Sequence, residues 1–493
     1  MILKISGNIK PYYVQTLAMI FFPGAKFPED EEETPETVVA SLDLTEADGF
    51  VRAKVKIKQG EKSSEAEAEA ALDGDADKRR KIAAGEAFMK AGGEFTGVTP
   101  PWGILTGVRP AKVATELLAG GLTPEEAAAS ISREYFVSLI KSKLAVDVAE
   151  AEARIITDGI RRECSVYIGI PFCPTRCAYC SFVSYTSPKL LKMIPDYLTA
   201  LCADVDGIFS VVRELGMRVS TVYIGGGTPT ILTSEQMKVL LSKVREHVSD
   251  LDEFTCEAGR PDTITREKLA VAKEYGVDRI SVNPQTLNDE VLRAIGRAHS
   301  TDMFFEAYGV AREIGIKNVN VDLIAGLPYD TTESFMRSID GIIALSPENI
   351  TVHTFSVKRS SEFRTEGRYD PASVIAAESV DYSQKALSAA GYLPYYMYRQ
   401  KNTVGNQENV GYAKPGHEGL YNIYMMEEVH SIFASGAGSV TKLVSLPDGE
   451  GNVRIERLFQ PKYPYEYLDN FADEKAAEKL AELRRASTEF FGK

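Results

Sequence analysis

The stretch Tyr167-Ile168-Gly169-Ile170-Pro171-Phe172-Cys173-Pro174-Thr175-Arg176-Cys177-Ala178-Tyr179-Cys180 is the most informative part of the chain. It opens with a short apolar run that is typical of a buried strand. It closes in a loop that holds three cysteines within eight residues. A [4Fe-4S] cluster usually takes four thiolates, so three in one loop leave one iron open to an external ligand. We therefore predict that Cys173, Cys177 and Cys180 bind such a cluster.

Zinc is the alternative reading of these cysteines. Structural zinc prefers four closed ligands, and no fourth Cys or His follows at zinc-finger spacing. The other cysteines, Cys164, Cys202 and Cys256, stand alone in the sequence, and we interpret them as small buried hydrophobic residues. Six cysteines in 493 residues do not make a disulfide framework.

A glycine-rich turn, Gly225-Gly226-Gly227-Thr228-Pro229, ends the next predicted strand. Glycines let a backbone approach a ligand closely, and the carbonyls of this turn can accept hydrogen bonds from an ammonium group. Alone, the turn could be an ordinary one. Its position one strand after the cysteine loop favours a binding site for the amino acid part of S-adenosylmethionine (SAM), whose amino and carboxylate groups can chelate the open iron.

Apolar runs alternate with amphipathic helical stretches from residue 165 onward, which predicts parallel βαβ units. Six such units predict an α/β fold, a partial (β/α)6 barrel with its chemistry at the carboxyl ends of the strands. The predicted strands are 166–170, 219–224, 254–258, 279–282, 319–324 and 349–355. Glu257, Gln285 and Asp322 lie at or near the ends of these strands. Any one of them could be a structural residue, but together they favour ligand binding.

The flanking regions carry no catalytic constellation before residue 160. We expect a small α+β domain over 1–95, a helical linker region over 96–160, the barrel over 161–360 and a covering segment over 361–493. Within the first domain, 51–57 alternates as a half-solvated strand does, and 65–91, rich in Ala, Glu and Lys, is predicted to be helical. Beyond 360 we expect irregular structure, with a helical tail from about Tyr465.

Charge and hydropathy restrict the kinds of partner and the location that the sequence allows. The formal net charge is −14, which argues against a nucleic-acid partner because phosphate binding needs a basic surface. No apolar run approaches the roughly 20 residues of a membrane span. The first seven residues lack the features of a signal peptide. We expect a soluble, cytoplasmic protein.

On these motifs the chain resembles the oxygen-independent coproporphyrinogen III oxidases, which are radical SAM enzymes, and most of all their HemZ-type coproporphyrinogen dehydrogenase branch. The likeness covers roughly 165–445. It rests on 167–173, the cysteine spacing, the glycine turn, Arg297-Ala298-His299, the strand around Asp322 and Gly436-Ala437-Gly438. Gly107-Val108-Arg109-Pro110 also looks like that branch.

The resemblance implies two cofactors, a [4Fe-4S] cluster on the three cysteines and SAM beside it. Tyr167 and Tyr179 would flank both and take part in catalysis. The other positions that match SAM-binding residues of the family are Gly226, Gly227, Thr228, Glu257, Gln285, Arg297, Asp322 and, more loosely, Ser356 and Val440.

The resemblance also implies the reaction. The reduced cluster donates one electron to SAM, and the resulting 5′-deoxyadenosyl radical removes a hydrogen from the β-carbon of a porphyrinogen propionate. Loss of CO2 and one electron leaves a vinyl group, and two rounds give protoporphyrinogen IX in haem biosynthesis. The expected partners are a tetrapyrrole substrate and a reducing protein such as flavodoxin or ferredoxin. For the anionic substrate, Tyr395–Lys401 and Lys358-Arg359 offer aromatic rings and cations, although the first stretch could equally pack on the barrel.

Two departures from the family bear on function. Phe182 stands where some members carry a further cysteine. Relatives that act as haem chaperones carry a His-Asn-x-x-Tyr-Trp motif, but this chain has Tyr421-Asn422-Ile423-Tyr424-Met425. The missing His and Trp weigh against a haem carrier on the same scaffold. That carrier and a radical SAM enzyme that acts on haem itself stay open as the two alternatives.

Overall fold

The computed structural model describes residues 1–28, 30–107, 109–180, 184–356, 374–400, 403–449, 451–471 and 475–492. It divides into two compact units. The smaller unit comprises Met1–Glu150, Asp370–Ala377 and Met397–Glu408, and the larger unit comprises Ala151–Tyr369, Glu378–Tyr396 and Asn409–Lys493. Both units therefore contain residues from distant parts of the sequence.

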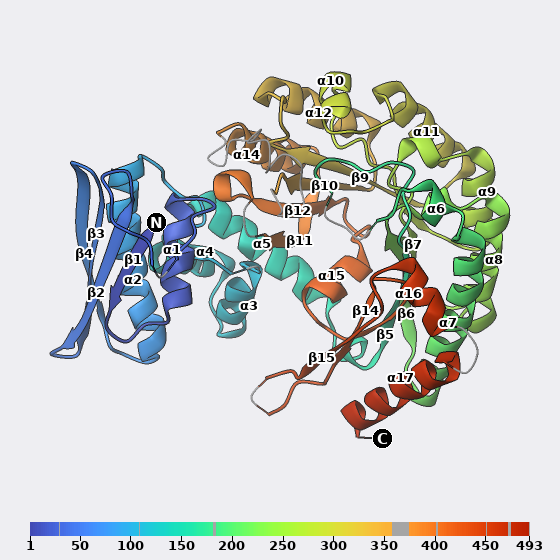
Figure 1. The fold of residues 1–493 in the computed structure, drawn as a ribbon, viewed down its shortest axis with the longest axis horizontal. Coiled ribbons are helices and arrows are strands. Elements are labelled where there is room, and N and C mark those ends of the chain that lie inside the picture. Colours follow the sequence, from blue (N-terminus) through green and yellow to red (C-terminus); the bar gives the residue numbers. More distant parts are fainter. Residues whose placement is uncertain are drawn as a thin grey trace. The chain divides into compact units, whose positions relative to one another are not determined.

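The smaller unit is built on a four-stranded sheet in the order β1-β2-β3-β4, with helices packed on one face (Figure 1). Its core lies between that face and the apolar sides of α1 and α2, where Leu17, Val55 and Phe88 are fully buried. The elements are β1 Ile2–Ser6, α1 Pro11–Phe21, β2 Val39–Ala47, β3 Phe50–Gln59, β4 Lys62–Ala71, α2 Ala76–Thr96, α3 Ala111–Ala119, α4 Pro124–Tyr135 and α5 Leu139–Ile155.

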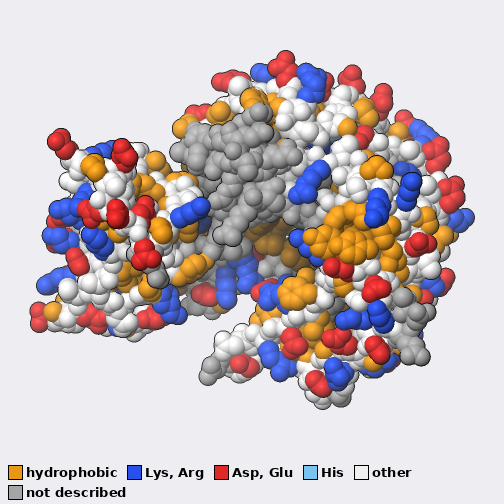
Figure 2. Space-filling model, viewed as in Figure 1, with side chains coloured by type: hydrophobic (Ala, Val, Ile, Leu, Met, Phe, Trp, Pro, Cys, Tyr) orange, Lys and Arg blue, Asp and Glu red, His pale blue; other side chains and the backbone are white. Residues whose placement is uncertain are grey.

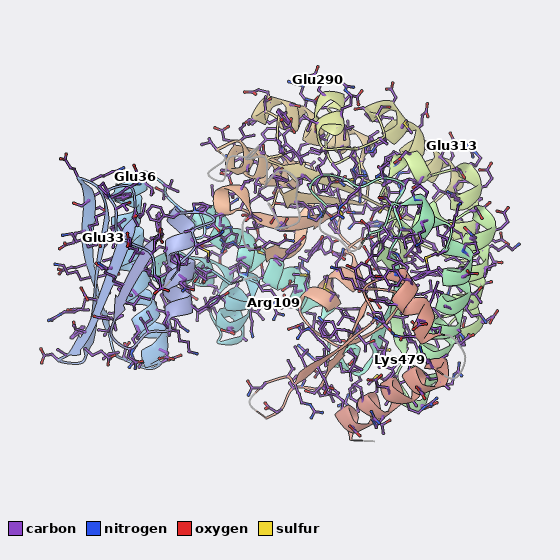
Figure 3. The ribbon with its side chains drawn as sticks, in the orientation of Figure 1. Glu33, Glu36, Arg109, Glu290, Glu313 and Lys479 are labelled. Atoms are coloured by element: carbon purple, nitrogen blue, oxygen red, sulfur yellow. The ribbon has the colours of Figure 1, made fainter. Side chains whose placement is uncertain are left out.

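The opposite face of this sheet is charged. Lys54 on β3 pairs with Glu65 and Glu67 on β4, at 2.6 and 3.0 Å. Glu33, labelled in Figure 3, pairs with Lys4 at 3.1 Å and also with Lys58. Cross-strand pairs of opposite charge stabilise a sheet modestly. This confirms the predicted half-solvated strand at 51–57.

The helix predicted over 65–91 is wrong in its first part. Residues up to Ala71 form strand β4, and the helix starts only at Ala76. Ala and Glu favour helices, but in this stretch they alternate, so Glu65, Glu67 and Glu69 share one face, as a strand requires. Lysine and arginine side chains of β3 pair with these glutamates across the strands. This pairing outweighs the helix propensity of Ala and Glu.

Helix α2 continues through Gly92-Gly93, beyond the predicted end at residue 91, and ends at Thr96. The helices expected between 110 and 160 are present as α3, α4 and α5. A charged pair is buried beside them: the Lys141 ammonium on α5 lies 2.8 Å from the Glu408 carboxylate, and Trp102 Nε1 donates to that carboxylate at 2.7 Å. This contact joins residues that are 267 positions apart.

The larger unit contains the predicted parallel strands. They lie in the order β10-β9-β8-β7-β6-β5, and helices α7, α8, α9 and α11 run along their outer side (Figure 1). The strands and helices of this part are β5 Cys164–Ile170, α6 Pro188–Leu191, α7 Ile194–Glu214, β6 Val219–Gly226, α8 Ser234–His247, β7 Glu253–Cys256, α9 Arg266–Glu274, β8 Arg279–Ser281, α10 Asp289–Ala294, α11 Thr301–Ile314, β9 Asn318–Ala325, α12 Thr332–Leu345 and β10 Asn349–Thr354. Short 3-10 turns occur at Ile160–Arg162, Pro229–Ile231, Pro261–Thr263 and Val404–Asn406.

Five further strands extend this sheet at both edges, so the complete sheet is mixed. Strand β13 pairs with β5 in parallel, β14 and β15 follow it antiparallel, and β12 lies antiparallel to β10. The part after residue 360 is thus more regular than expected. Its elements are α14 Val374–Ala389, β11 Leu393–Arg399, β12 Glu408–Ala413, α15 Leu420–Met426, β13 Ser431–Ser435, β14 Val440–Val444, β15 Ile455–Phe459, α16 Pro464–Asn470 and α17 Lys475–Phe491. The helical tail is confirmed.

Local signals explain several boundaries. Thr233 and Gln236 form a capping box at the start of α8, each side chain accepting from the other's backbone N–H. Cys164 is the first residue of β5. After the cysteine loop the chain forms two successive helices, α6 and α7. Among the described residues, the structure has no helix with the length and hydropathy to cross a bilayer.

Candidate functional site

The cysteine loop and the glycine turn meet at the carboxyl ends of β5 and β6. In the β5–β6 ladder Gly169 lies opposite Gly225, and Gly227 N–H then donates to the Ile170 carbonyl at 2.7 Å. A side chain at Gly227 would place its Cβ 2.5 Å from the Phe172 carbonyl oxygen and 3.0 Å from Cys173 Sγ. Only glycine therefore lets the turn lie this close to the loop. Cys173 Sγ lies 3.2 Å from the Thr228 hydroxyl.

The rest of the loop is held by two buried arginines. Arg260 Nη1 donates to the Thr175 carbonyl at 3.1 Å and lies 3.8 Å from Cys177 Sγ, while its other nitrogens pair with the Asp262 carboxylate at 3.1 and 2.9 Å. Arg297 Nε donates to the Tyr179 hydroxyl at 3.1 Å. Both guanidinium groups bring positive charge to a loop whose thiolates are negative when they bind metal.

The donor set fits an iron–sulfur cluster. Cys173 and Cys177 are buried and Cys180 is half-buried, and all three are unbridged. In the described part of the chain no three Cys, His, Asp or Glu side chains converge on one metal ion. A cubane cluster does not require that convergence, because each cysteine binds a different iron. The glycine that leaves room beside Cys173 is a second observation in favour of the cluster.

Glu257 directly follows β7, at the carboxyl end of that strand. The Tyr223 hydroxyl donates to its carboxylate, and the Tyr223 ring stacks on those of Tyr167 and Tyr421, with centroids 6.2 and 4.4 Å away. Burial raises the pKa of Glu257 to about 7, although the Tyr223 hydrogen bond acts in the opposite direction. The carboxyl is thus poised near neutral pH to hold or release a proton.

Asp322 lies in β9, and its carboxylate accepts from Asn320 Nδ2 at 2.7 Å and from Asn283 Nδ2 at 2.8 Å. His353 Nε2 is 3.7 Å away. Burial opposes ionisation, but His353 and the hydrogen bonds outweigh it and lower the pKa of Asp322. Gln285 is tied to the same strand through its backbone, since its N–H donates to the Asp322 carbonyl at 3.1 Å. Its φ of 70° is unusual for a residue other than glycine.

The C-terminal segment reaches the same strand as the cysteine loop. Gly436 has φ 94°, and a Cβ there would lie 2.4 Å from the Gly169 carbonyl oxygen. Val440 begins β14, directly after this turn, and Ser356 follows β10. The roles of Ser356 and Val440 stay predictions.

For Tyr395–Lys401 the structure favours packing, one of the two roles that the sequence left open. Tyr395 and Tyr396 are buried in β11, and Arg399 is buried in the smaller unit with its guanidinium over the Trp102 ring and a 2.6 Å hydrogen bond to Asn406 Oδ1. Arg399 therefore serves packing in this structure. Phe182, Lys358, Arg359 and Lys401 lie outside the described residues.

Three residues of the site were not anticipated from the sequence: Arg260, Tyr223 and His353. Each lies in or directly after a predicted parallel strand, at Val219–Gly226, Glu253–Cys256 or Asn349–Thr354. Tyr421 is brought to the site by Glu253, which is paired with Arg279 at 3.0 Å. The Glu253 carboxylate accepts from the backbone N–H groups of Leu420 and Tyr421 at the start of α15. The signal available in the sequence was the placement of polar residues at strand ends.

Comparisons with known proteins agree with this geometry. Residues 167–342 match the model of the radical SAM superfamily. The chain is 37% identical over 479 residues to the oxygen-independent coproporphyrinogen-III oxidase-like protein HemZ of Bacillus subtilis (strain 168), a match that covers 94% of both chains. It is 32% identical over 324 residues to the heme chaperone HemW of the same organism, covering 64% of this chain and 81% of that one.

Among solved structures, coproporphyrinogen III oxidase (HemN) from Escherichia coli matches with a TM-score of 0.50 and 24% identity. The match covers 66% of this chain and 72% of that chain. At this identity the likeness shows a shared fold.

Proposed function

The chain belongs to the radical SAM family of oxygen-independent coproporphyrinogen III oxidase-like proteins, and we propose that it oxidatively decarboxylates coproporphyrinogen III to protoporphyrinogen IX without oxygen. The observation that carries the proposal is a relative that matches over nearly the full length, including the smaller unit. The site supports the proposal. Three cysteines lie in one loop beside the glycine turn, and two carboxyl groups are buried at strands β7 and β9.

The family uses a [4Fe-4S] cluster and SAM. When bound, they supply a one-electron cleavage that yields a carbon radical able to remove a hydrogen atom from an unactivated carbon. Cys173, Cys177 and Cys180 would hold the cluster. Gly226, Gly227 and Thr228 would accept or donate hydrogen bonds at the amino acid end of SAM, while Glu257 and Asp322 would bind its other polar groups.

Each round removes from one propionate a hydrogen atom at the β-carbon, the carboxyl group as CO2 and one electron, which passes to an external acceptor. A carbon–carbon double bond remains. The chain's own residues orient the reactants and exclude water. The stacked rings of Tyr167, Tyr223 and Tyr421 supply a dry, rigid wall next to Glu257.

A haem carrier is the second candidate, because the relatives include the chaperone HemW. The structure supplies an argument against it at Tyr421, where the chaperone motif has its histidine. The Tyr421 ring is buried and stacks against the rings of Tyr167 and Tyr223. Tyr424 is buried against His430, with centroids 4.7 Å apart. These side chains serve the packing of the larger unit. An enzyme that acts on haem itself is the remaining alternative.

The test is an anaerobic assay of the reconstituted protein with SAM, a reductant and coproporphyrinogen III, read by mass spectrometry. Loss of two CO2 together with formation of 5′-deoxyadenosine supports the decarboxylase. Deoxyadenosine without a porphyrinogen product contradicts the substrate, and haem is then the next compound to try. An intact cluster without SAM cleavage, together with tight haem binding, favours the carrier.

A further inference from the structure

Radical SAM chemistry needs one electron from outside the chain for each SAM that is cleaved. We propose that a small acidic electron-carrier protein docks on the surface beside the cysteine loop of the larger unit. This surface, called the tyrosine patch below, consists of Tyr185, Tyr463, Tyr465, Lys189, Lys192 and Lys462. The inference rests on the cluster and SAM of the proposed function, but not on the identity of the tetrapyrrole.

The aromatic part of the patch faces solvent. Tyr463 is 39% exposed and Tyr465 is 50% exposed, and their rings stack with centroids 5.3 Å apart. Tyr185 lies against Tyr463, with centroids 5.6 Å apart. Figure 2 shows a hydrophobic patch near α16, with Lys and Arg side chains at several points of its edge. Exposed tyrosines gathered in one place are typical of protein-binding surfaces.

The patch is connected to the cysteine loop through the backbone. Tyr185 N–H donates to the Pro171 carbonyl at 2.8 Å, and Cys173 N–H donates to the Tyr185 carbonyl at 3.1 Å. The Tyr185 hydroxyl donates to the Lys462 carbonyl at 3.1 Å, which ties the loop to the start of α16. One hydrogen bond thus separates a surface tyrosine from a cluster ligand. Electron tunnelling weakens steeply with distance. A carrier bound at the tyrosine patch would be connected to the cluster ligand Cys173 by a short path of covalent bonds and one hydrogen bond.

The charge of this surface differs from that of the chain as a whole. The chain carries 70 acidic and 56 basic residues, yet residues 164–195 contain no Asp or Glu and three basic residues, Arg176, Lys189 and Lys192. These three side chains and Lys462 are exposed. Two acids border the patch: Glu466 acts on both Tyr185 and Tyr465, and Asp196 is exposed four positions after Lys192.

A basic surface on an acidic protein attracts and orients an acidic partner, which raises the rate of productive encounter. A second copy of this chain would present the same basic surface, so like charges oppose self-association here. The carrier's reduced group gives up one electron and is oxidised, while the cluster accepts that electron. No atom is transferred.

The experiment measures cluster reduction alone, without a tetrapyrrole, so that a wrong substrate cannot affect it. A purified acidic bacterial flavodoxin in its reduced form is mixed anaerobically with the reconstituted protein, and the loss of cluster absorption is followed by stopped flow. In the variant Lys189→Glu/Lys192→Glu we expect the second-order rate constant at low ionic strength to fall at least tenfold. The difference should shrink as salt is added. Reduction by photoreduced deazaflavin, a small molecule, should be unchanged.

The control variant is Lys273→Glu/Lys317→Glu, which makes the same change in charge. Both lysines are exposed and precede β8 and β9, at the amino ends of strands whose carboxyl ends face the site. A control that slows as much as the test variant would show a general charge effect and overturn the docking site. Equal rates in the test variant and the parent would overturn it too.

A second measurement covers the aromatic residues. In Tyr463→Ser/Tyr465→Ser we expect at least a fivefold weaker affinity for oxidised flavodoxin, measured by biolayer interferometry, which requires no intact cluster. Unchanged binding contradicts the proposal. A loss of dimers in this variant, measured by light scattering, would identify the patch as a self-association surface instead.

Discussion

At the scale of residues, Glu257 and Asp322 are two buried carboxyl groups whose surroundings move their pKa values in opposite directions. Burial raises the pKa of Glu257 to about 7, whereas His353, Asn320 and Thr351 lower the pKa of Asp322 in spite of its burial. A pair of this kind divides the work between a group that exchanges a proton near neutral pH and one that stays charged. Tyr223 and Gly226 moderate the shift at Glu257, and Asp322 adds to it.

The first prediction concerns Tyr223→Phe. The Tyr223 hydrogen bond stabilises the ionised form of Glu257, so its loss should raise the pKa of Glu257 further. We propose that ionised Glu257 binds SAM, so SAM affinity should fall as the pH drops through this pKa. The midpoint should therefore move to higher pH, by about one unit, which corresponds to about 1.36 kcal/mol. Equilibrium dialysis of SAM over a pH series measures it.

The matched control is Tyr424→Phe, which removes a buried hydroxyl on α15 whose ring contacts His430. Its SAM-binding midpoint should equal that of the parent. A Tyr223→Phe midpoint that does not move would show that Glu257 does not govern SAM affinity.

The second prediction concerns Arg260. A guanidinium beside Cys177 Sγ stabilises the more negative, reduced cluster, so Arg260→Gln should lower the reduction potential. The shift should be on the order of 59 mV, which is tenfold for a one-electron couple. Arg260→Lys keeps the charge and should shift it less. Redox titration followed by electron paramagnetic resonance measures this, and an unchanged potential in Arg260→Gln contradicts the role.

The sequence predicted the residues of this site that belong to a recognisable motif, such as the cysteines and the glycine turn. Arg260 and Tyr223 were missed because their importance lies in contacts across strands, with Cys177 and Glu257 respectively. Arg399 shows what the sequence left open: an arginine among tyrosines could contact a substrate or pack, and its partners in the structure are Trp102 and Asn406. No spacing rule reveals such partners.

At the scale of elements, helix α2 depends on close contact with α1. A Cβ at Gly92 would lie 2.6 Å from the Phe21 ring, whereas a Cβ at Gly93 would have ordinary contact with the Val98 carbonyl at 3.5 Å. Two adjacent glycines in one helix therefore have different reasons for being there. Gly92 is required by packing, and Gly93 is not.

The third prediction uses this pair. Gly92→Ala should destabilise the smaller unit by about 1–3 kcal/mol, because a buried ring must move. Gly93→Ala should stabilise it by up to about 1 kcal/mol, because Ala favours the helix. Trp102, the chain's one tryptophan, lies in this unit, so its fluorescence during urea unfolding reports the right transition. Equal effects of the two changes would contradict the packing argument.

The elements themselves were predicted where one signal dominated. The parallel strands followed from apolar runs, and α8 from its capping box. Strand β4 was missed because Ala and Glu favour a helix locally, while the lysines that hold the strand lie on β3. The strands after residue 393 were missed because their partners, β10 and β5, lie far away in the sequence.

At the scale of the whole molecule, the smaller unit is completed by residues from the C-terminal half. Glu408 is fully buried and Lys141 is 2% exposed, so the two charges depend on each other. The first 150 residues are therefore not a self-sufficient module.

The fourth prediction follows from that pair. Glu408→Gln leaves the buried Lys141 ammonium without its carboxylate and should destabilise the unit by about 3–5 kcal/mol. Removing both charges in Lys141→Met/Glu408→Met should cost less. Lys479→Ala, at a surface pair with Glu482 (Lys479 is labelled in Figure 3), should change stability by less than about 0.5 kcal/mol. Urea unfolding measures all three, and a Glu408→Gln effect as small as the surface control would contradict the argument.

The pairing of β13 with β5 has a consequence for biosynthesis. Strand β5 leads directly into the cysteine loop, but its neighbour on one side is Ser431–Ser435. While the ribosome is still translating the middle of the message, β5 is an open edge, and open edges aggregate. The nascent chain must therefore keep this edge covered, for instance by a chaperone, for most of its synthesis. The strand that carries the cysteine loop therefore lacks one of its two neighbours until Ser431–Ser435 has been made.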